Sequence, residues 1–118
     1  MTKQLVLILE DEAMIALDLE GALKAAGFTV VLASTRVEAE AILADHRPDA
    51  AVLDVQIGDD DCTSVAKALT ARGVPFVLHT GRDVVDREIF SIAVWIFAKP
   101  TDTRAIAQTL KSMLSEDG

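Results

Sequence analysis

Three carboxylates stand directly after short apolar runs of the chain. Glu10 and Asp11 follow the run Leu5–Leu9, and Asp54 follows the run Ala50–Leu53. If the three share one pocket they repel one another, and without compensation the pKa of at least one of them is raised. A hard cation relieves this repulsion. Because Mg²⁺ takes oxygen ligands and usually keeps several waters, one or two carboxylates suffice to hold it. These residues therefore predict a magnesium site.

A hydroxyl group and an ammonium group follow two further apolar runs, at Thr80 and Lys99. Both groups can hydrogen-bond to a phosphoryl group, and the ammonium can neutralise its charge. The backbone carbonyl of Gln56, two residues past Asp54, can turn toward the same site. A carboxylate nucleophile, a divalent cation, a hydroxyl and a lysine together suit phosphoryl transfer to Asp54, which would form an aspartyl phosphate.

The elements that must position these residues alternate between strands and helices. Short runs rich in Val, Ile and Leu predict five buried strands, at 5–9, 28–32, 50–53, 74–78 and 94–97. Apolar spacing and capping signals predict helices at 13–26, 63–72, 83–90 and 102–114. A further helix, the second along the chain, is predicted to begin at a capping box formed by Thr35 and Glu38 and to end at residue 47. The second helix is expected to bury Val37, Ala41 and Ala44. Residues 58–61 predict only a polar loop.

Five strand–helix units in a row predict a single α/β domain over residues 1–118. Right-handed crossovers between parallel strands give a doubly wound five-stranded parallel sheet with helices on both faces. Such sheets bind ligands at the carboxyl ends of the strands, where the strand order reverses. In the order 2-1-3-4-5 of a flavodoxin-like fold, strands one and three are neighbours at this point. Glu10, Asp11 and Asp54 are then expected in one pocket.

The charge balance excludes several classes of partner. The chain holds 11 Lys and Arg against 19 Asp and Glu, a formal net charge of −8, with one Trp and no Tyr. It offers neither a basic patch for phosphates nor aromatic platforms for bases, so we expect no direct nucleic-acid binding. No apolar stretch is long enough for a membrane span or a secretory signal, and the single cysteine, Cys62, cannot form an internal disulfide. A cytoplasmic location is expected.

At this point the sequence resembles a known family. Four positions at the ends of four strands, taken in order, are similar to the receiver domain of two-component response regulators: Glu10-Asp11, Asp54, Thr80 and Lys99-Pro100. Each element alone occurs by chance in many proteins, whereas the ordered set is specific, and the resemblance covers nearly the whole chain. The run 73–81, which ends in Thr-Gly, further resembles receivers that stand alone as single domains.

The resemblance implies a role for each matching residue. The Mg²⁺ ligands would be Glu10, Asp11, Asp54 and the backbone carbonyl of Gln56. Asp54 would accept the phosphoryl group, Thr80 would be the switch hydroxyl, and Lys99 would contact the phosphate. The domain would take a phosphoryl group from a histidine kinase or a histidine phosphotransferase and switch the binding of a protein partner. Its chemistry would be limited to self-phosphorylation and self-dephosphorylation at Asp54.

Two features depart from the family pattern. The family usually has an aromatic residue three positions before the lysine, where this chain has Ile96 with Trp95 beside it. The segment between Asp54 and Thr80 is also short. Both features concern the output mechanism more than the phosphorylation. Trp95 itself is expected in the core.

Other interpretations of the same residues stay open at this point. The acids at 10–12 could be a helix N-terminus that favours negative charge. The whole domain could be a pseudo-receiver that binds proteins without being phosphorylated. A flavodoxin-like cofactor domain would need a phosphate cradle rich in Gly, Ser and Thr after the first strand, where this chain has acids. His46 and His79 are not expected to be catalytic. His46 lies in a loop that ends a helix, and His79 has no Cys or acid at metal-ligand spacing.

Overall fold

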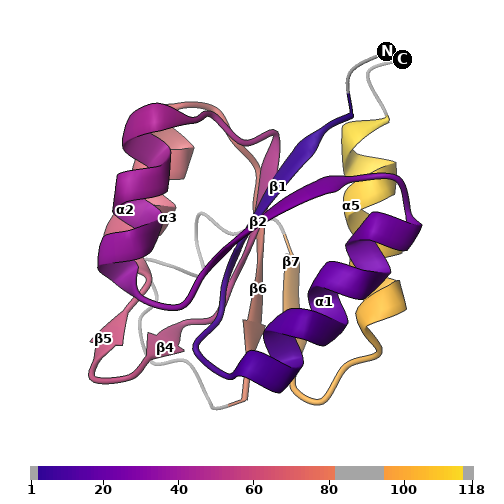
Figure 1. Cartoon of the computed structure of the whole chain (residues 1–118), viewed down its shortest axis with the longest axis horizontal. Helices are drawn as coiled ribbons and strands as arrows, with labels where there is room; N and C mark the ends of the chain where they lie inside the picture. The colour runs from indigo at the N-terminus through magenta and orange to yellow at the C-terminus, as the bar shows by residue number, and fades with distance from the viewer. Residues whose placement is uncertain (1–2, 82–94, 116–118) are drawn as a thin grey trace.

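The computed structural model describes residues 3–81 and 95–115 of the chain. Its main feature is a five-stranded parallel sheet in the order β2-β1-β3-β6-β7 (Figure 1). The strands are β1 (Leu5–Leu9), β2 (Thr29–Ala33), β3 (Ala50–Leu53), β6 (Phe76–Thr80) and β7 (Trp95–Ala98). Counted without the short strands β4 and β5, this order is the predicted 2-1-3-4-5, so the doubly wound α/β fold is confirmed.

Helices cover both faces of this sheet. α1 (Ala13–Ala25) and α5 (Thr103–Leu114) lie on one face, and α2 (Arg36–Asp45) and α3 (Thr63–Ala71) lie on the other (Figure 1). The helix predicted at 83–90 lies outside the described residues. Within 3–81 and 95–115, no helix is long and apolar enough to cross a membrane.

Each face of the sheet has its own apolar core, because the central strands are buried on both sides. In β1, Leu7 and Leu9 pack toward α2 and α3, whereas Val6 and Ile8 pack toward α1 and α5. This follows from the alternation of side chains along a strand. A strand covered on both faces shows a continuous apolar run, which is the pattern that predicted it. Where this run ends, at Glu10, the polar site begins.

The fourth strand of the sheet ends two residues later than the sequence predicts. β6 spans Phe76–Thr80 rather than 74–78. The backbone N–H of Lys99 donates to the carbonyl of Thr80 at 2.8 Å, and this bond extends the ladder between β6 and β7. His79 and Thr80 therefore belong to the strand itself, and both are buried.

A short antiparallel hairpin replaces the polar loop expected at 58–61. It consists of β4 (Gln56–Ile57) and β5 (Asp60–Asp61), joined by Gly58 and Asp59. Gly58 has a φ of 61°, in the left-handed region that favours glycine at such a turn. Ile57 anchors the hairpin in the core that is shared with α2 and α3. The hairpin gives the residues after Asp54 a defined place.

Helix α2 buries a different face from the predicted one. The expected apolar residues, Val37, Ala41 and Ala44, are exposed, and Val37 keeps 64% of its surface. Ala39 and Leu43 pack into the core instead, with Ile42 partly buried beside them. Ile42 and Leu43 are the largest apolar side chains of the last turns, and their burial sets the rotation of the helix. The spacing of small residues did not reveal this.

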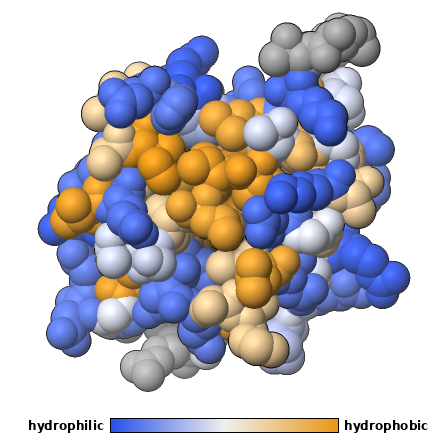
Figure 2. All heavy atoms as spheres, viewed as in Figure 1, coloured by the Kyte–Doolittle hydropathy of each residue, from blue (hydrophilic) through white to orange (hydrophobic). Residues whose placement is uncertain are grey.

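The edge strands of the sheet leave apolar side chains at the surface. Leu32 of β2 is exposed, as are Trp95 and Ile96 of β7. Figure 2 shows apolar surface gathered over the middle of the face on which β2 lies in front, framed by hydrophilic side chains. The expectation that Trp95 belongs to the core is wrong, because it keeps 52% of its surface exposed on an edge strand.

Candidate functional site

The register of the sheet sets three polar residues in a row across its carboxyl end. Leu53 of β3 pairs with Leu9 of β1 on one side and with Leu78 of β6 on the other. The residues that follow them are Glu10, Asp54 and His79. The ladder continues to this row, because the N–H of Asp54 donates to the carbonyl of Leu9 at 2.9 Å. All three side chains are buried, on the sheet face that α1 and α5 cover.

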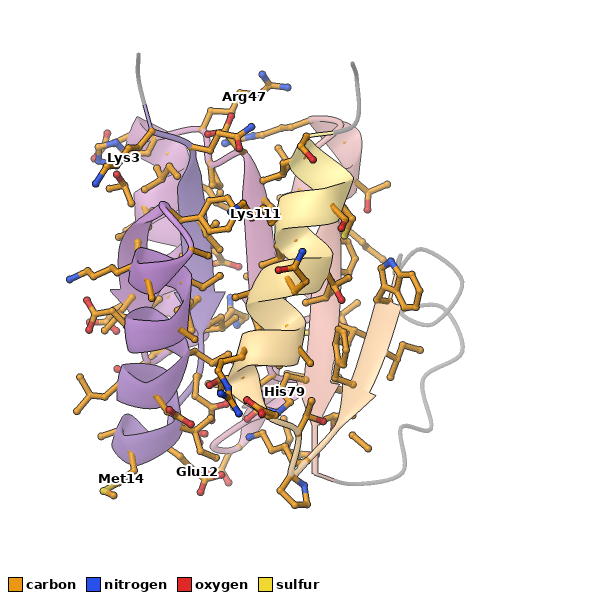
Figure 3. All side chains as sticks on the ribbon, turned by 90° about the vertical axis from the view of Figure 1, so that its right-hand side faces the viewer. Lys3, Glu12, Met14, Arg47, His79 and Lys111 are labelled. Atoms are coloured by element: carbon orange, nitrogen blue, oxygen red, sulfur yellow. The ribbon has the colours of Figure 1, made fainter. Side chains whose placement is uncertain are left out.

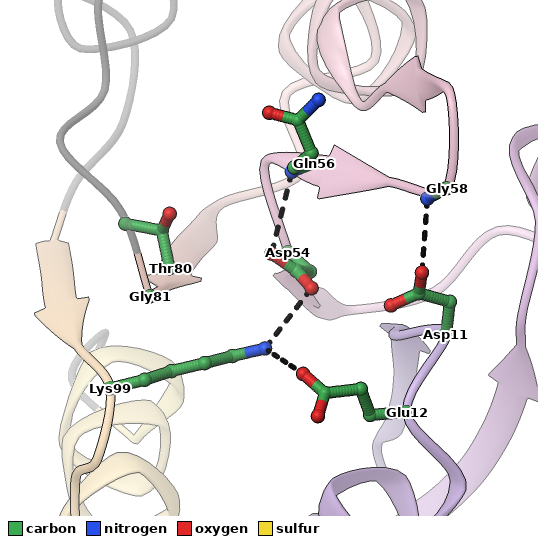
Figure 4. Close-up of a pocket in the computed structure, with 8 residues that line it drawn as sticks. All are labelled: Asp11, Glu12, Asp54, Gln56, Gly58, Thr80, Gly81 and Lys99. Carbon is green, nitrogen blue, oxygen red and sulfur yellow. Dashed lines mark hydrogen bonds and ion pairs between the residues drawn. The ribbon is translucent and has the colours of Figure 1, made fainter.

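Lys99 reaches over this row from the end of β7. Its Nζ lies 3.0 Å from Glu10 Oε1. It also lies 3.1 Å from Asp54 Oδ2 and 3.5 Å from Glu12 Oε1 (Figure 4). The Lys99 side chain is 13% exposed, and those of Glu10 and Asp54 are 1% and 7% exposed. Burial lowers the pKa of Lys99, but the hydrogen bonds to Glu10 and Asp54 and the negative charges of these acids together outweigh this effect and hold the pKa above its ordinary value. One ammonium group thus forms ion pairs with three carboxylates.

The negative charge of Glu10 is only partly compensated by Lys99. Burial raises the pKa of Glu10 from 4.5 to about 7, and the negative charge of Asp54 adds to the rise. The hydrogen bond from Lys99 acts in the opposite direction without cancelling the effect of burial. Glu10 therefore stands close to its midpoint of ionisation at neutral pH, and a further cation would favour its charged form.

Asp11 turns toward the β4–β5 hairpin. Its Oδ2 accepts a hydrogen bond from the N–H of Gly58 at 3.0 Å, while Asp54 Oδ1 accepts one from the N–H of Gln56 at 3.4 Å (Figure 4). The hairpin therefore contacts the carboxylates that follow β1 and β3. Its backbone amides help to fix the direction in which both carboxylates point.

These groups line a cavity of ≈ 350 Å³. The lining contains five of the predicted site residues together with Glu12, Gly58 and Gly81; the five are Asp11, Asp54, Gln56, Thr80 and Lys99. Glu10 lies beside it, in contact with Lys99. The structure thus brings the predicted residues together. Sequence reasoning missed Glu12 as a site residue, although its place in the same acidic run was a signal.

The acidic end of β1 fits a hard divalent cation. Carboxylate oxygens of Glu10, Asp11 and Glu12 lie within 4.8 Å of one another. Together with Asp54 they present more negative charge than Lys99 can offset, and oxygen donors are the ligands that Mg²⁺ prefers. Glu12 stands at the N-cap of α1 but makes no side-chain capping hydrogen bond. A purely helix-capping role for these acids therefore does not account for their arrangement.

His79 is the unexpected member of the row. It is 3% exposed, and neither ring nitrogen has a hydrogen-bond partner among the residues that the structure describes. Burial lowers the pKa of His79, and the charge of Lys99 lowers it further, against the opposite effect of Asp54. The imidazole is therefore neutral at pH 7. Figure 3 shows it at the same end of the molecule as Glu12.

Replacing His79 by leucine is expected to stabilise the protein. A buried polar group without a partner costs about 1–3 kcal/mol, and leucine fills a similar volume without polar atoms. We expect His79→Leu to raise the free energy of unfolding by about 1 kcal/mol at neutral pH, measured by urea denaturation. The gain should grow as the pH falls below 6.5, because the unfolded wild-type chain binds a proton at His79 that the folded chain resists. The control is His46→Gln, at an exposed histidine. A loss of stability at every pH would contradict this account.

The contribution of Glu10 to stability changes with pH in the opposite direction to that of His79. Its pKa of about 7 in the folded chain lies above 4.5, so its contribution is complete below pH 4.5 and is lost as the pH rises through 7. In EDTA, the unfolding free energy of wild type relative to Glu10→Gln should decrease by up to roughly 3 kcal/mol between about pH 5 and about pH 8. Urea denaturation across this range measures it. A difference that stays constant with pH would show that the pKa of Glu10 is not raised.

Comparison with known proteins gives this arrangement a family. The sequence model of the response regulator receiver domain matches residues 6–111. The response regulator MprA of Mycobacterium sp. (strain KMS) is 34% identical over 86 residues, and that of Mycobacterium ulcerans (strain Agy99) is 35% identical over 86 residues. Each match covers 71% of this chain, which spans about 37% of the length of these relatives.

Solved structures share the fold over almost the whole chain. A CheY-like response regulator receiver domain protein from Methanospirillum hungatei JF-1 has a TM-score of 0.86 at 25% identity, over 98% of this chain and 96% of that one. A two-component response regulator from Clostridium difficile has a TM-score of 0.85 at 20% identity, over 98% and 99%. The family match includes every residue of the polar row and Lys99. The chain therefore belongs to the response regulator receiver domains of two-component systems.

Proposed function

We propose that Asp54 accepts a phosphoryl group in a Mg²⁺-dependent reaction, and that this modification switches the binding of a protein partner. One observation carries the proposal. The Asp54 carboxylate is buried at the end of β3, 3.1 Å from Lys99 Nζ, and lines a cavity together with acids that follow β1. Receiver domains interact with histidine kinases or phosphotransferases, so the proposed donor is a phosphohistidine of such a protein.

In the proposed reaction an oxygen of Asp54 attacks the phosphorus of the donor. The P–N bond of the phosphohistidine breaks as the new P–O bond forms, and the donor imidazole leaves. Lys99 Nζ lies close enough to Asp54 to contact an oxygen of the transferred group and neutralise part of its charge. The N–H of Gln56 donates to the other carboxylate oxygen and helps to orient the nucleophile.

The proposed metal ligands are Glu10, Asp11, Asp54 and the backbone carbonyl of Gln56, with Glu12 as a further acidic neighbour. When bound, Mg²⁺ supplies positive charge that offsets the repulsion between these carboxylates and a phosphoryl group. The chain itself prepares the ligands. The N–H of Gly58 holds the Asp11 carboxylate, and Lys99 holds Glu10 and Asp54 against their mutual repulsion.

Thr80 and Lys99 are proposed to transmit the change. Thr80 lines the same cavity as Asp54, and its carbonyl accepts the N–H of Lys99, so the ends of β6 and β7 are joined at the site. A phosphoryl group that draws in the Thr80 hydroxyl and Lys99 moves both strand ends. Ile96 is 46% exposed on β7, where the family usually has an aromatic switch residue. We therefore expect a smaller rearrangement on that side of the sheet than in receivers that have the aromatic residue. A ligand shifts a conformational equilibrium only by the difference in its affinity for the two states.

The direct test of phosphorylation is intact-mass spectrometry after incubation with acetyl phosphate and Mg²⁺. Wild type should gain the mass of one phosphoryl group, and the gain should disappear in EDTA and in Asp54→Asn. Asp59→Asn, which removes an exposed carboxylate from the nearby hairpin turn, is the matched control and should label like wild type. Thr80→Ala should also label, because its hydroxyl is proposed to sense the phosphoryl group rather than to accept it.

Two outcomes would contradict the proposal in different ways. Equal labelling of Asp54→Asn and wild type would place the phosphoryl group on another residue. A wild-type chain that accepts no phosphoryl group, either from acetyl phosphate or from a phosphorylated histidine phosphotransferase, would instead favour a receiver-like interaction module that is not phosphorylated.

A further inference from the structure

A single arginine joins three elements on the outer side of the site. Arg36 is the first residue of α2, and its Nε donates to Asp60 Oδ2 of β5 at 2.5 Å. Its Nη1 lies 3.0 and 2.9 Å from the two carboxylate oxygens of Glu40. Glu40 Oε2 also accepts a hydrogen bond from Ser64 Oγ of α3 at 2.8 Å. These contacts connect α2 and α3 to the β4–β5 hairpin.

The other side of this hairpin contacts the acidic site. Ile57 pairs with Asp60 across the hairpin, and Gly58 follows Ile57 at the turn. The N–H of Gly58 donates to Asp11 Oδ2 at 3.0 Å. Asp11, Arg36, Gly58 and Asp60 also line one cavity of ≈ 460 Å³ beside the site. The arginine therefore holds the residue that pairs with Ile57, one position away from the amide that orients Asp11.

The hairpin needs such external contacts to keep its place. Each of its strands has two residues, and an isolated two-stranded hairpin is marginally stable at best in water. Ile57 anchors β4 in the core, whereas Gly58 and the acids at 59–61 are exposed. The ion pair between Arg36 and Asp60 ties the exposed half of the hairpin to α2. A second contact joins it to α3, because Asp61 Oδ1 accepts the N–H of Thr63 at 2.9 Å.

We propose that Arg36 is a positioning residue of the metal site: its ion pair with Asp60 fixes the hairpin so that the Gly58 amide holds Asp11 ready to bind Mg²⁺. This inference rests on the proposed function, because it assumes that Asp11 is a metal ligand. The sign of the expected effect separates it from simple electrostatics. Removing a positive charge near an acidic site should strengthen cation binding by Coulomb attraction, whereas loss of a positioning contact should weaken it.

The test compares Mg²⁺ binding by isothermal titration calorimetry in wild type, Arg36→Gln, Asp60→Asn and Asp59→Asn. Asp59→Asn removes the same charge from the same hairpin and is the matched control for Asp60→Asn. An exposed ion pair of this kind corresponds to a change of about two- to fivefold in an equilibrium constant. We expect the Kd for Mg²⁺ to rise about two- to fivefold in Arg36→Gln, and to rise more in Asp60→Asn than in Asp59→Asn.

Amide hydrogen exchange of Gly58 in the metal-free protein gives a second readout. Exchange should be faster in Arg36→Gln and Asp60→Asn than in wild type, and unchanged in Asp59→Asn. Urea denaturation of each variant shows whether the whole fold has been weakened. If Arg36→Gln fails to fold, Asp60→Asn alone decides the question, because it leaves the contact between Arg36 and Glu40 in α2 intact.

If wild type binds Mg²⁺, and Arg36→Gln binds it as tightly or more tightly with unchanged amide exchange of Gly58, this inference is overturned while the proposed metal site stands. A wild-type protein that binds no Mg²⁺ overturns the proposed metal site together with this inference. Loss of Mg²⁺ affinity in both Arg36→Gln and Asp60→Asn, with the Asp59→Asn control close to wild type, supports the inference.

Discussion

The interaction on which the site depends is the contact of one ammonium group with several carboxylates. Lys99 is the described cation that reaches Glu10 and Asp54, and both of these acids are buried. An uncompensated buried charge is costly, so this lysine offsets much of the cost of keeping two acids at the carboxyl end of the sheet. The compensation is incomplete, as the raised pKa of Glu10 shows. The fold therefore holds an excess of negative charge at the place where strand order reverses.

This imbalance has consequences for both stability and function. A site with too few cations favours the binding of another one, and the oxygen donors of Glu10, Asp11 and Glu12 favour a hard ion. His79, next in the row, adds a buried imidazole without a partner among the described residues. Both features cost stability in the metal-free protein. Strain of this kind is common at functional sites, where the surrounding fold has to support groups that would not assemble by themselves.

The sequence revealed the parts of the fold that follow from burial. Strands covered on both faces must be continuously apolar, so β1 and β3 were predicted with their observed bounds. The acids that follow these two strands were predicted as site residues. The β4–β5 hairpin was not predicted, because Ile57 is the one apolar side chain among its four strand residues. The other three are polar or acidic, a composition that is typical of a loop. Its contacts with Asp11 and Arg36 depend on tertiary structure that local spacing does not encode.

Other differences arise where tertiary packing chooses between similar patterns. The buried face of α2 is set by Leu43 rather than by the spacing of small residues, and Trp95 is exposed because β7 lies at the edge of the sheet. Glu12 and Lys99 meet although they are far apart in the chain. Sequence reasoning identified the residue types that chemistry needs at the strand ends. It did not identify which carboxylate faces the lysine and which faces the hairpin.

The stability of Lys99→Met in the absence and presence of Mg²⁺ tests the central claim most directly. In EDTA at about pH 8, the variant should lose about 3 kcal/mol of unfolding free energy in urea, because buried carboxylates are left without their cation. The loss should shrink near pH 6, where Glu10 becomes protonated, and Mg²⁺ should stabilise the variant more than wild type. Lys24→Met, at an exposed lysine paired with Glu20, should lose less than about 1 kcal/mol. A Lys99→Met protein as stable as wild type in EDTA at both pH values would contradict the account.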